Sequence, residues 1–361
     1  MIHDVAIIGA GMAGASLAAA IGTRARVMLI EAEDMPGRHA TGRSAAFWSE
    51  TYGGPAVQPL TTASGPTLRA GGYLTPLGSL HIGRAEDSGR VEQLLQDFAD
   101  TGVDLSRVDP AQRVPGLRPA WVHGVWEPSC AYIDVAALHA DYLAAAKASG
   151  AAVMTDAALV SAARRDGLWH LDTRAGSVEA RVLVNAAGAW ADQVAALAGA
   201  APIGITPYRR TMVQLRTDPP APEGLPHVLD VAGRFYFKPE AGGKLWLTPH
   251  DETPSVPCDI APEEWDVAVA IDRLEKAVDW RVEAVERRWA GLRSFAPDRV
   301  PVYGYDVKVP GFFWCAGQGG FGIQTAPAAS AMAAALLLGE GDIPRGVDAE
   351  RYGVGRFSAK E

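Results

Sequence analysis

The sequence predicts an α/β protein in which one domain, with a parallel sheet, is assembled from separated parts of the chain and carries an inserted α+β domain built on an antiparallel sheet. Three largely apolar runs, 5–8, 181–185 and 311–316, each lead into glycine or alanine, as buried parallel strands do before a turn. The block 200–308 instead alternates apolar and polar residues between turns, which is typical of antiparallel strands. A chain of 361 residues is long enough for both domains.

The first segment, which begins at Asp4 with DVAIIGAGMAG, orders strand, glycine-rich turn, helix and second strand as a dinucleotide-binding unit does. Gly9, Gly11 and Gly14 follow the G-x-G-x-x-G spacing, which provides a tight turn, a close approach of backbone to pyrophosphate and a tight crossing of helix on strand. Glu31 ends the second strand, where an acid accepts hydrogen bonds from the adenosine ribose and disfavours a 2′-phosphate. The unit predicts dinucleotide binding and leaves FAD and NAD open.

A loop rich in turn-forming residues, 34–54, follows this unit and carries Arg43 among several aromatic side chains. We interpret it either as a floor or lid for the cofactor or as a surface loop packed on its own base. Asp134 is placed to cap a helix over 135–149. Hydrophobic spacing predicts the other elements of this region, strands at 72–74, 79–82 and 122–126 and a helix over 91–100.

The remaining pattern defines the two domains. Residues 151–187 are mainly β, the strand at 311–316 runs into GQGGFGIQT and an alanine-rich helix to Leu338, and one helix at 263–279 interrupts the antiparallel block. The carboxyl ends of the three parallel strands, at residues 9, 186 and 317, therefore meet at one sheet edge, where α/β proteins bind ligands. We predict a cofactor domain from 1–45, 134–200 and 309–361, and a substrate domain from 46–133 and 201–308.

Composition narrows the class of protein. A formal net charge of −9 argues against nucleic acid as a partner, because nucleic-acid binding needs a concentrated basic surface. The three cysteines lack the spacing of a disulfide framework or a thiolate metal site, so we expect a reducing compartment and no metal. No apolar run is long enough for a transmembrane segment. We expect a cytoplasmic protein, and contact with the inner face of the membrane stays open.

Several motifs in fixed order carry a family resemblance. GAGMAG with Glu31, ATGRSAA at 40–46, LVNAAGAWAD at 183–192, and GLRSF followed by FFWCAGQGGFGIQTAP resemble the D-amino-acid oxidase superfamily of FAD enzymes over nearly the whole chain. The sequence is most similar to the bacterial FAD-dependent D-amino acid dehydrogenases, especially the D-arginine dehydrogenase type. The resemblance implies a Rossmann-type FAD-binding domain, an inserted substrate domain and FAD as the cofactor. We expect the FAD to be noncovalent because Cys315, the candidate for a covalent bond, lies in a strand expected to be buried.

The resemblance also implies which residues meet the cofactor. They comprise the glycine turn, the ribose acid, the loop past pyrophosphate and flavin, the strand near Val160 that meets adenine, the second strand end, and the loop beside the pyrimidine side of the flavin. In this sequence they are Gly9, Gly11, Met12, Ala13, Gly14, Glu31, Ala32, Arg38, Thr41, Arg43, Ser44, Ala45, Ala46, Val160, Ala187, Gly188, Trp190, Gly317, Gly319, Gly320, Phe321, Gly322, Ile323 and Gln324.

On the substrate side, Arg210 and Arg293 match carboxylate-binding arginines of the family, and a guanidinium suits this role because its planar fork pairs with both carboxylate oxygens. Tyr52 and Tyr236 match tyrosines that border the pocket, and Gly320 lies beside it. Without the resemblance, an arginine is more often a surface residue or an ion-pair partner than a ligand contact, and the alternative for each tyrosine is a buried structural role. We assign catalytic roles to these two arginines and two tyrosines.

Two positions depart from the pattern of enzymes that grip a cationic side chain. Ser79 stands where those enzymes have a carboxylate, and Phe47 replaces a histidine near the flavin. We therefore expect neutral, apolar D-amino acids to be oxidised to 2-oxo acids and ammonia, with oxygen or a quinone as acceptor. Glu50 could supply a carboxylate from another direction. Alternatives are an oxidase or dehydrogenase of secondary amines such as N-methyl amino acids or proline, a flavin-binding subunit without catalysis, and an NAD-linked dehydrogenase.

A protein base is not obvious, and none is needed if the substrate amine binds neutral. His81 and His250 are candidates, although isolated histidines are more often structural. Cys315 raises the idea of a covalent flavin bond, but a cysteine in a buried strand is commonly a small apolar residue.

Overall fold

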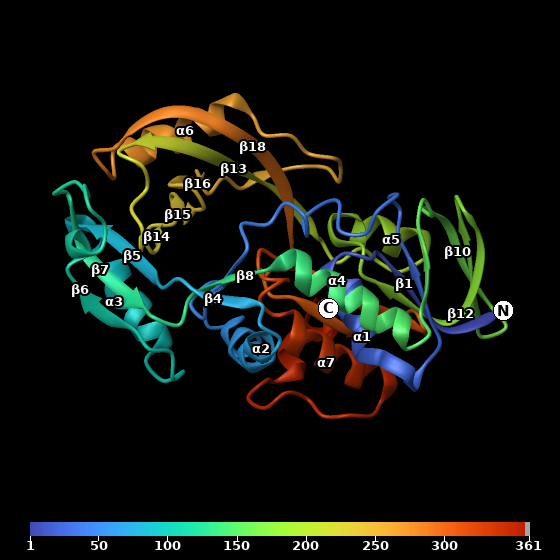
Figure 1. Cartoon of the computed structure of the whole chain (residues 1–361). Coiled ribbons are helices and arrows are strands. Elements are labelled where there is room, and N and C mark those ends of the chain that lie inside the picture. Colours follow the sequence, from blue (N-terminus) through green and yellow to red (C-terminus); the bar gives the residue numbers. More distant parts are fainter. Residues whose placement is uncertain (358–361) are drawn as a thin grey trace.

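The computed structural model describes residues 1–357, so residues 358–361, which the predicted cofactor domain includes, lie outside the described part. Two large sheets dominate the described chain, and Figure 1 shows them as separate layers joined near the middle of the molecule. The helices are α1 (Met12–Ile21), α2 (Gln58–Ala70), α3 (Ser88–Phe98), α4 (Val135–Ala148), α5 (Ala191–Leu197), α6 (Glu264–Glu275) and α7 (Ala326–Leu338).

The first sheet contains the predicted parallel strands. Its strands, within the described residues, are β1 (Ile2–Ile8), β2 (Val27–Ile30), β9 (Ala152–Met154), β10 (Leu159–Arg165), β11 (Leu168–Thr173), β12 (Gly176–Asn185), β19 (Val302–Tyr305) and β20 (Phe312–Ala316). β1 lies between β2 and β12, β9 extends the β2 side, and β20 extends the β12 side, all in parallel pairs. The three strand ends predicted to meet therefore do meet.

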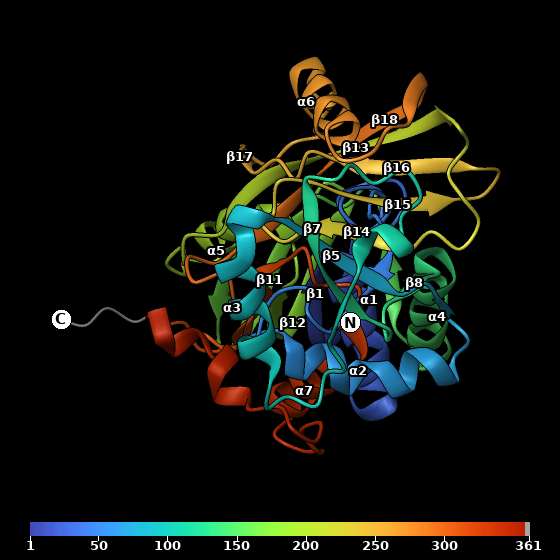
Figure 2. The ribbon, with the colours of Figure 1, turned by 90° about the vertical axis from the view of Figure 1, so that its left-hand side faces the viewer.

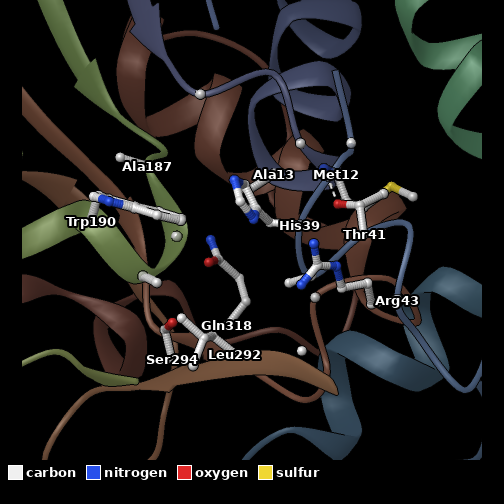
Figure 3. Close-up of a pocket in the computed structure, with 18 of the residues that line it drawn as sticks. Met12, Ala13, His39, Thr41, Arg43, Ala187, Trp190, Leu292, Ser294 and Gln318 are labelled. Atoms are coloured by element: carbon white, nitrogen blue, oxygen red, sulfur yellow. Dashed lines mark hydrogen bonds between the residues drawn. The ribbon is translucent and has the colours of Figure 1, made fainter. Parts of the chain in front are cut away.

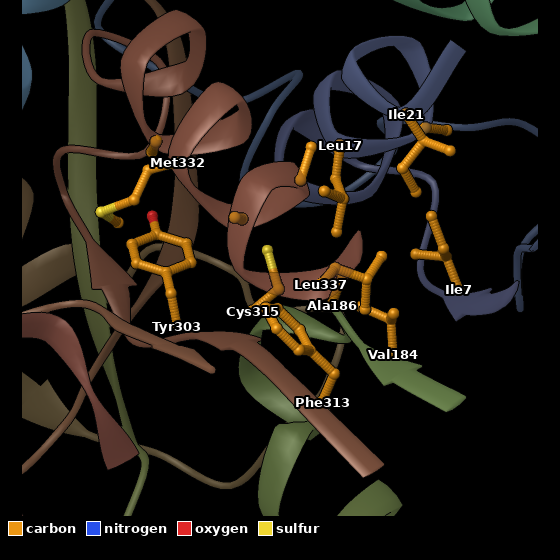
Figure 4. Packing of buried hydrophobic residues seen from close by; sticks show 14 of the residues in the cluster. Ile7, Leu17, Ile21, Val184, Ala186, Tyr303, Phe313, Cys315, Met332 and Leu337 are labelled. Atoms are coloured by element: carbon orange, nitrogen blue, oxygen red, sulfur yellow. The ribbon is translucent and has the colours of Figure 1, made fainter. Parts of the chain in front are cut away.

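Apolar helices cover one face of this sheet and contribute to the burial of its strands on both sides. Leu17 of α1 and Met332 of α7 pack over Ile7 and Val184 of the strands (Figure 4). Alanine dominates α1 and α7, which lets the helices approach the sheet and each other closely. The other face packs Leu171 of β11 and neighbours against α5 in a second core. We call this sheet, covered on both faces, the platform; the glycine turn lies at its edge.

The second sheet is the predicted antiparallel one, with a single parallel pair, β5 with β14, among the described strands. Its order is β21-β18-β13-β16-β15-β14-β5-β7-β6, with β17 beside β13. The strands are β5 (Ser79–Arg84), β6 (Ser106–Val108), β7 (Trp121–Glu127), β13 (Thr206–Asp218), β14 (His227–Asp230), β15 (Tyr236–Glu240), β16 (Lys244–Thr248), β17 (Thr253–Pro254), β18 (Arg281–Phe295) and β21 (Gln318–Gly319). The sheet curves over the platform in Figure 2, with α6 on its outer side.

A small third sheet joins the two layers. It consists of β3 (Phe47–Trp48), β4 (Leu74–Pro76) and β8 (Ala131–Ile133), in the order β3-β8-β4. Asp134 begins α4 as predicted, since its side chain accepts a hydrogen bond from the Ala137 amide.

The structure differs from the sequence prediction between residues 58 and 84 and at one domain boundary. Residues 58–70 form α2, where no helix was predicted, because three glycines and two prolines within QPLTTASGPTLRAGG mask the helical pattern. The buried side of α2 packs on α7. The strand predicted at 72–74 begins instead at Leu74. β19, assigned to the substrate domain, pairs with β20 of the cofactor sheet. The rest of the two-domain division stays a prediction.

Candidate functional site

A cavity of about 510 Å³ lies where the platform meets the curved sheet. Its lining runs from Glu31 and Ala157 at one end to Tyr236 and Arg293 at the other. Figure 3 shows the turn before α1 and the loop after β2 on one side, the end of β12 on another, and the strand that carries Leu292 and Ser294 opposite. We call the two ends the nucleotide end and the substrate end.

The glycine turn brings backbone to the cavity wall. Gly9 has φ +100°, and a Cβ there would overlap the carbonyl oxygen of Ala186 at the end of β12. A Cβ on Gly14 would overlap the carbonyl oxygen of Gly9. Glycine at both positions therefore lets β1, β12 and α1 meet closely, as predicted, and Gly11 and Met12 line the cavity. The start of α1 presents amide groups there, which suits a phosphate.

The loop after β2 is tied to this turn. Glu31 is buried, and its Oε2 accepts a hydrogen bond from the Ala10 amide at 2.9 Å while its Oε1 accepts one from the Glu33 amide at 3.1 Å. A carboxylate held in this way retains lone pairs for ribose hydroxyls. Thr41 also reaches back, since its Oγ1 accepts a hydrogen bond from the Met12 amide at 3.0 Å.

Sequence reasoning missed His39. Its ring lies in the cavity wall near Ala13, 4.8 Å from the ring of Trp190 between centroids (Figure 3). Its Nε2 is 2.7 Å from Oε1 of Glu33, which lines the cavity as well. The available signal was its place within GRHATGRSAA, the segment otherwise assigned to the cofactor.

Arg38 and Arg43 both line the cavity but are already paired. Arg38 lies 3.2 Å from Asp34 and is half exposed. Arg43 pairs with Asp259 and donates to the carbonyl oxygens of Ile260 and Ala290 at 3.1 and 3.2 Å, so it ties the loop to the curved sheet. We therefore assign Arg43 a bracing role in addition to its place at the cavity.

Most residues predicted to meet the cofactor line this one cavity, and four do not. Val160 is 57% exposed and points away, while Ala157 and Leu159 take the place predicted for it at the nucleotide end. The prediction missed by one residue because the register of β10 shifts between Leu159 and Ser161, where Val160 is exposed. Gly14, Gly317 and Phe321 lie behind the wall. The predicted residues that line it are Gly9, Gly11, Met12, Ala13, Glu31, Ala32, Arg38, Thr41, Arg43, Ser44, Ala45, Ala46, Ala187, Gly188, Trp190, Gly319, Gly320, Gly322, Ile323 and Gln324.

The substrate end contains the predicted arginine pair. Arg210 on β13 and Arg293 on β18 share a face, because Arg293 is the cross-strand partner of Tyr208, two residues before Arg210. Arg293 donates to the hydroxyl of Tyr52 at 2.8 Å. Both guanidiniums lie 3.3 Å from Oε1 of Glu252. Nη1 of Arg210 is buried without a hydrogen-bond partner among the described residues, an unused donor at the cavity end.

Burial shifts the pKa values of two side chains at the substrate end. Burial, together with the neighbouring positive charge of Arg210, lowers the pKa of Arg293, although Tyr52, Tyr236 and Glu252 oppose the shift. Burial and then Tyr52 raise the pKa of Tyr236, against the two arginines, so its hydroxyl stays protonated. Gly320 has no Cβ in the space that the Arg293 guanidinium occupies. Two positive charges thus lie at the cavity with little solvent, an arrangement that favours an anionic ligand group.

Apolar and aromatic side chains complete the substrate end. Phe47, Met212 and Tyr236 form a buried cluster, with the rings of Phe47 and Tyr236 5.7 Å apart. Ser79 does not belong to it: the residue is fully buried and absent from the lining, because β5 places it opposite His227, whose ring packs behind Phe47. The prediction that Ser79 contacts substrate is therefore wrong.

Carboxylates line only the nucleotide end of the cavity in the described structure, as Glu31 and Glu33. Glu50, the alternative source of a carboxylate, instead accepts a hydrogen bond from Thr62 and does not line the cavity. The acid nearest the substrate end is Glu252, whose Oε1 is engaged with both arginines, so no carboxylate among the described lining residues is free to pair with a cationic side chain there.

The two candidate bases lie outside the lining. His81 contacts Thr51 and the buried Glu127, and His250 contacts the carbonyl oxygen of Gly233 at 2.6 Å. Burial and then Arg210 and Arg293 lower the pKa of His250 well below its usual range. Cys315 is buried in β20, where burial raises its pKa to about 12, so its thiol stays protonated. No group among the described residues at the substrate end is suited to act as a strong base.

These features fit an FAD molecule. The nucleotide end supplies a close backbone turn, a helix start and a buried acid, and small residues at Ala187 and Gly319 leave room along the wall between the two ends. The class defined by fold and site is a flavoprotein with the two-sheet arrangement described above.

The sequence profile of the DAO family, described as FAD dependent oxidoreductase, matches residues 4–336. The chain belongs to this family, and its cofactor is FAD. Mixed α/β structure and the FAD cofactor, both predicted, are confirmed. None of the helices described by the structure combines the length and apolar character that a membrane crossing requires.

Relatives and solved structures extend this result. The chain is 29% identical over 220 residues to mouse (Mus musculus) mitochondrial dimethylglycine dehydrogenase, covering 55% of the chain and 25% of that protein. It is 26% identical over 229 residues to hydrogen cyanide synthase subunit HcnC of Pseudomonas aeruginosa, covering 61% and 52%. The chain therefore spans about a quarter to a half of the length of these relatives.

The fold itself matches solved structures over nearly their whole length. Glycine oxidase from Geobacillus kaustophilus superposes with a TM-score of 0.84 at 22% identity, covering 98% of this chain and 99% of the other. L-proline dehydrogenase from P. horikoshii superposes with a TM-score of 0.83 at 22% identity, covering 94% and 95%. These matches concern fold, and the resemblance to the D-arginine dehydrogenase type stays a prediction.

Proposed function

We propose that this protein oxidises the Cα–N bond of an amino acid, whose carboxylate binds Arg210 and Arg293. The single observation that carries the proposal is the pair of guanidiniums at the end of the cavity opposite Glu31, with Arg210 buried and the side chain of Arg293 12% exposed. A carboxylate there would meet the unused donor of Arg210 and gain charge-assisted hydrogen bonds in a site with little water. Oxygen or a quinone would reoxidise the cofactor.

The protein's role in the reaction is to orient and desolvate the substrate. Bound FAD would accept a hydride from the carbon that carries the amine. The two arginines fix the carboxylate, and Tyr52 steadies Arg293 through its hydroxyl. Their positive charge disfavours an ammonium beside them, which promotes binding of the neutral amine. A neutral amine needs no protein base, in keeping with the positions of His81 and His250.

The apolar wall favours neutral or apolar side chains. Phe47 and Met212 would contact the substrate side chain, and carboxylates line only the opposite end of the cavity. We propose neutral D-amino acids as substrates, with hydrolysis of the imine to a 2-oxo acid and ammonia. D-arginine and D-lysine would leave a cation without a partner, which is costly in a buried site.

Secondary amines are the second candidate. The names of two similar proteins favour amino acids substituted on nitrogen: proline is a secondary amine, and dimethylglycine is a tertiary amine with two N-methyl groups. The same arginine pair would hold the carboxylate of an N-methyl amino acid or proline, and Tyr236 would border its nitrogen substituent.

A substrate panel separates these candidates. We would add D-leucine, D-phenylalanine, D-arginine, L-proline, sarcosine and dimethylglycine anaerobically to the holoenzyme and follow loss of flavin absorbance. Bleaching by neutral D-amino acids supports the first candidate, and bleaching by sarcosine or L-proline alone supports the second. A D-arginine preference would contradict both, and absence of bleaching by any carboxylate-bearing amine would contradict the proposal as a whole. Admission of air then reports whether oxygen is the acceptor.

A further inference from the structure

Two side chains from distant parts of the chain form hydrogen bonds to the backbone of Ala10 in the glycine turn, one to its N–H and one to its carbonyl oxygen. Its N–H donates to Oε2 of Glu31 at 2.9 Å, and its carbonyl oxygen lies 2.8 Å from Nε2 of His139 on α4. Ala10 is fully buried and His139 is 8% exposed, so water does not replace either partner. Because a carbonyl only accepts hydrogen bonds, Nε2 of His139 must carry the hydrogen.

This second hydrogen bond fixes the direction of the next amide. In a planar trans peptide, the carbonyl of Ala10 and the N–H of Gly11 point in opposite directions. The N–H of Gly11 therefore points away from His139. Gly11 lines the cavity and His139 does not, so the amide turned away from the imidazole belongs to the cavity wall. In a G-x-G turn this stretch of backbone approaches the pyrophosphate.

His139 reaches the turn because α4 packs along α1 (Figure 1). Its ring also abuts the loop after β2: a Cβ on Gly37 would lie 2.9 Å from its Cε1. The imidazole thus fills the space between the turn and the loop that carries Thr41, and Thr41 in turn accepts from the Met12 amide. One side chain outside the cavity braces two of the segments that line it.

We infer that His139 is a positioning residue for FAD: its Nε2–H orients the Ala10–Gly11 peptide so that the Gly11 amide is available to the cofactor pyrophosphate. The inference depends on the FAD cofactor and not on the proposed substrate. A merely structural imidazole would support the stability of the fold and leave the affinity for FAD unchanged.

The test compares side chains that do or do not place a donor at the Nε2 position. In His139→Gln the amide nitrogen can take the place of Nε2, whereas in His139→Asn it is one methylene too short. We expect the dissociation constant for FAD, measured by flavin fluorescence as diluted holoenzyme releases it, to rise about tenfold for Asn and less than about threefold for Gln. ADP, titrated calorimetrically into cofactor-stripped protein, should show the same ratio, because it carries the pyrophosphate without the flavin.

A control separates orientation from stability. Leu143 lies one turn further along α4 and packs against the core that includes Ala10, but its apolar side chain cannot donate a hydrogen bond to the Ala10 carbonyl. Leu143→Ala should lower the melting temperature but change the FAD dissociation constant by less than about twofold. The inference is overturned if the Asn variant binds FAD and ADP as the natural protein does, if Gln is as impaired as Asn, or if Leu143→Ala weakens FAD as much as Asn does.

Discussion

The two ends of the cavity are lined by different kinds of groups. At the nucleotide end, backbone groups and small residues such as Gly9, Gly11 and Ala187 form the wall, and their spacing within a short segment determines the geometry. At the substrate end, long side chains from Arg210, Arg293 and distant strands converge across the curved sheet. Adding side-chain volume should therefore impair the nucleotide end most, and removing a charge should impair the substrate end most.

The largest effect is expected from removing a charge at the substrate end. Arg293→Gln should lower kcat/KM for a carboxylate-bearing substrate about 1,000-fold, because truncating one partner of a buried charge pair costs about 4 kcal/mol. Arg293→Lys should recover only part of this loss, since an ammonium lacks the planar fork. Steady-state kinetics measure the loss of kcat/KM. An unchanged FAD content would show that the effect is confined to the substrate end. A loss below fivefold would contradict the role assigned to Arg293.

A smaller effect should follow from adding volume at the nucleotide end. Gly14→Ala places a Cβ against the carbonyl oxygen of Gly9, so the dissociation constant for FAD should rise about 100-fold, as expected for overpacking by about 3 kcal/mol. Flavin absorbance per protein measures the occupancy. Ala20→Gly, on the same helix but away from the turn, should cost about 1 kcal/mol of stability without loss of FAD. Equal FAD loss in both variants would argue against a local effect.

The polar cluster behind the substrate end predicts a dependence on pH. Burial acts to raise the pKa of Glu127, but the nearby His81 imidazole, 3.7 Å away, and hydrogen bonds from Thr51 and Ser49 outweigh it and lower the pKa overall. A carboxyl group with a lowered folded-state pKa stabilises the fold above its unfolded pKa, near 4.3, and this stability is lost as pH falls through the folded value.

Glu127→Gln should therefore destabilise the protein by about 1–3 kcal/mol at pH 7, and the difference from the natural protein should shrink as pH falls below about 4. Urea denaturation at several pH values measures it. A difference that grows toward acid pH would mean that Glu127 is protonated in the folded protein.

The smallest effect is expected at Ser79. Because its side chain lies behind Phe47 and not at the cavity, Ser79→Ala should change kcat/KM less than about twofold for every substrate tested. Phe47→Ala serves as the matched change at the wall and should alter the preference among side chains. A shift of substrate preference in Ser79→Ala would restore the role first predicted for Ser79.

The sequence predicts the local backbone features of the site better than it predicts which single side chains join them. The turn, Glu31 and the loop at 317–324 were recognised because each is a local pattern with a backbone requirement. Val160 was misplaced because the choice of which β10 residue faces the cavity depends on strand pairing. His39 and His139 were missed because a single histidine carries no pattern, and only the packing of the β2 loop and of α4 gives each one a partner.

By itself, the sequence determined the class of fold, the dinucleotide turn and the family, because apolar periodicity and glycine spacing act over a few residues. Tertiary structure alone decided that Arg210 and Arg293 share a face, that Ser79 lies behind the wall and that α2 is a helix. The physical reason is that side-chain convergence depends on strand register and on burial against distant segments, which short stretches of sequence do not encode.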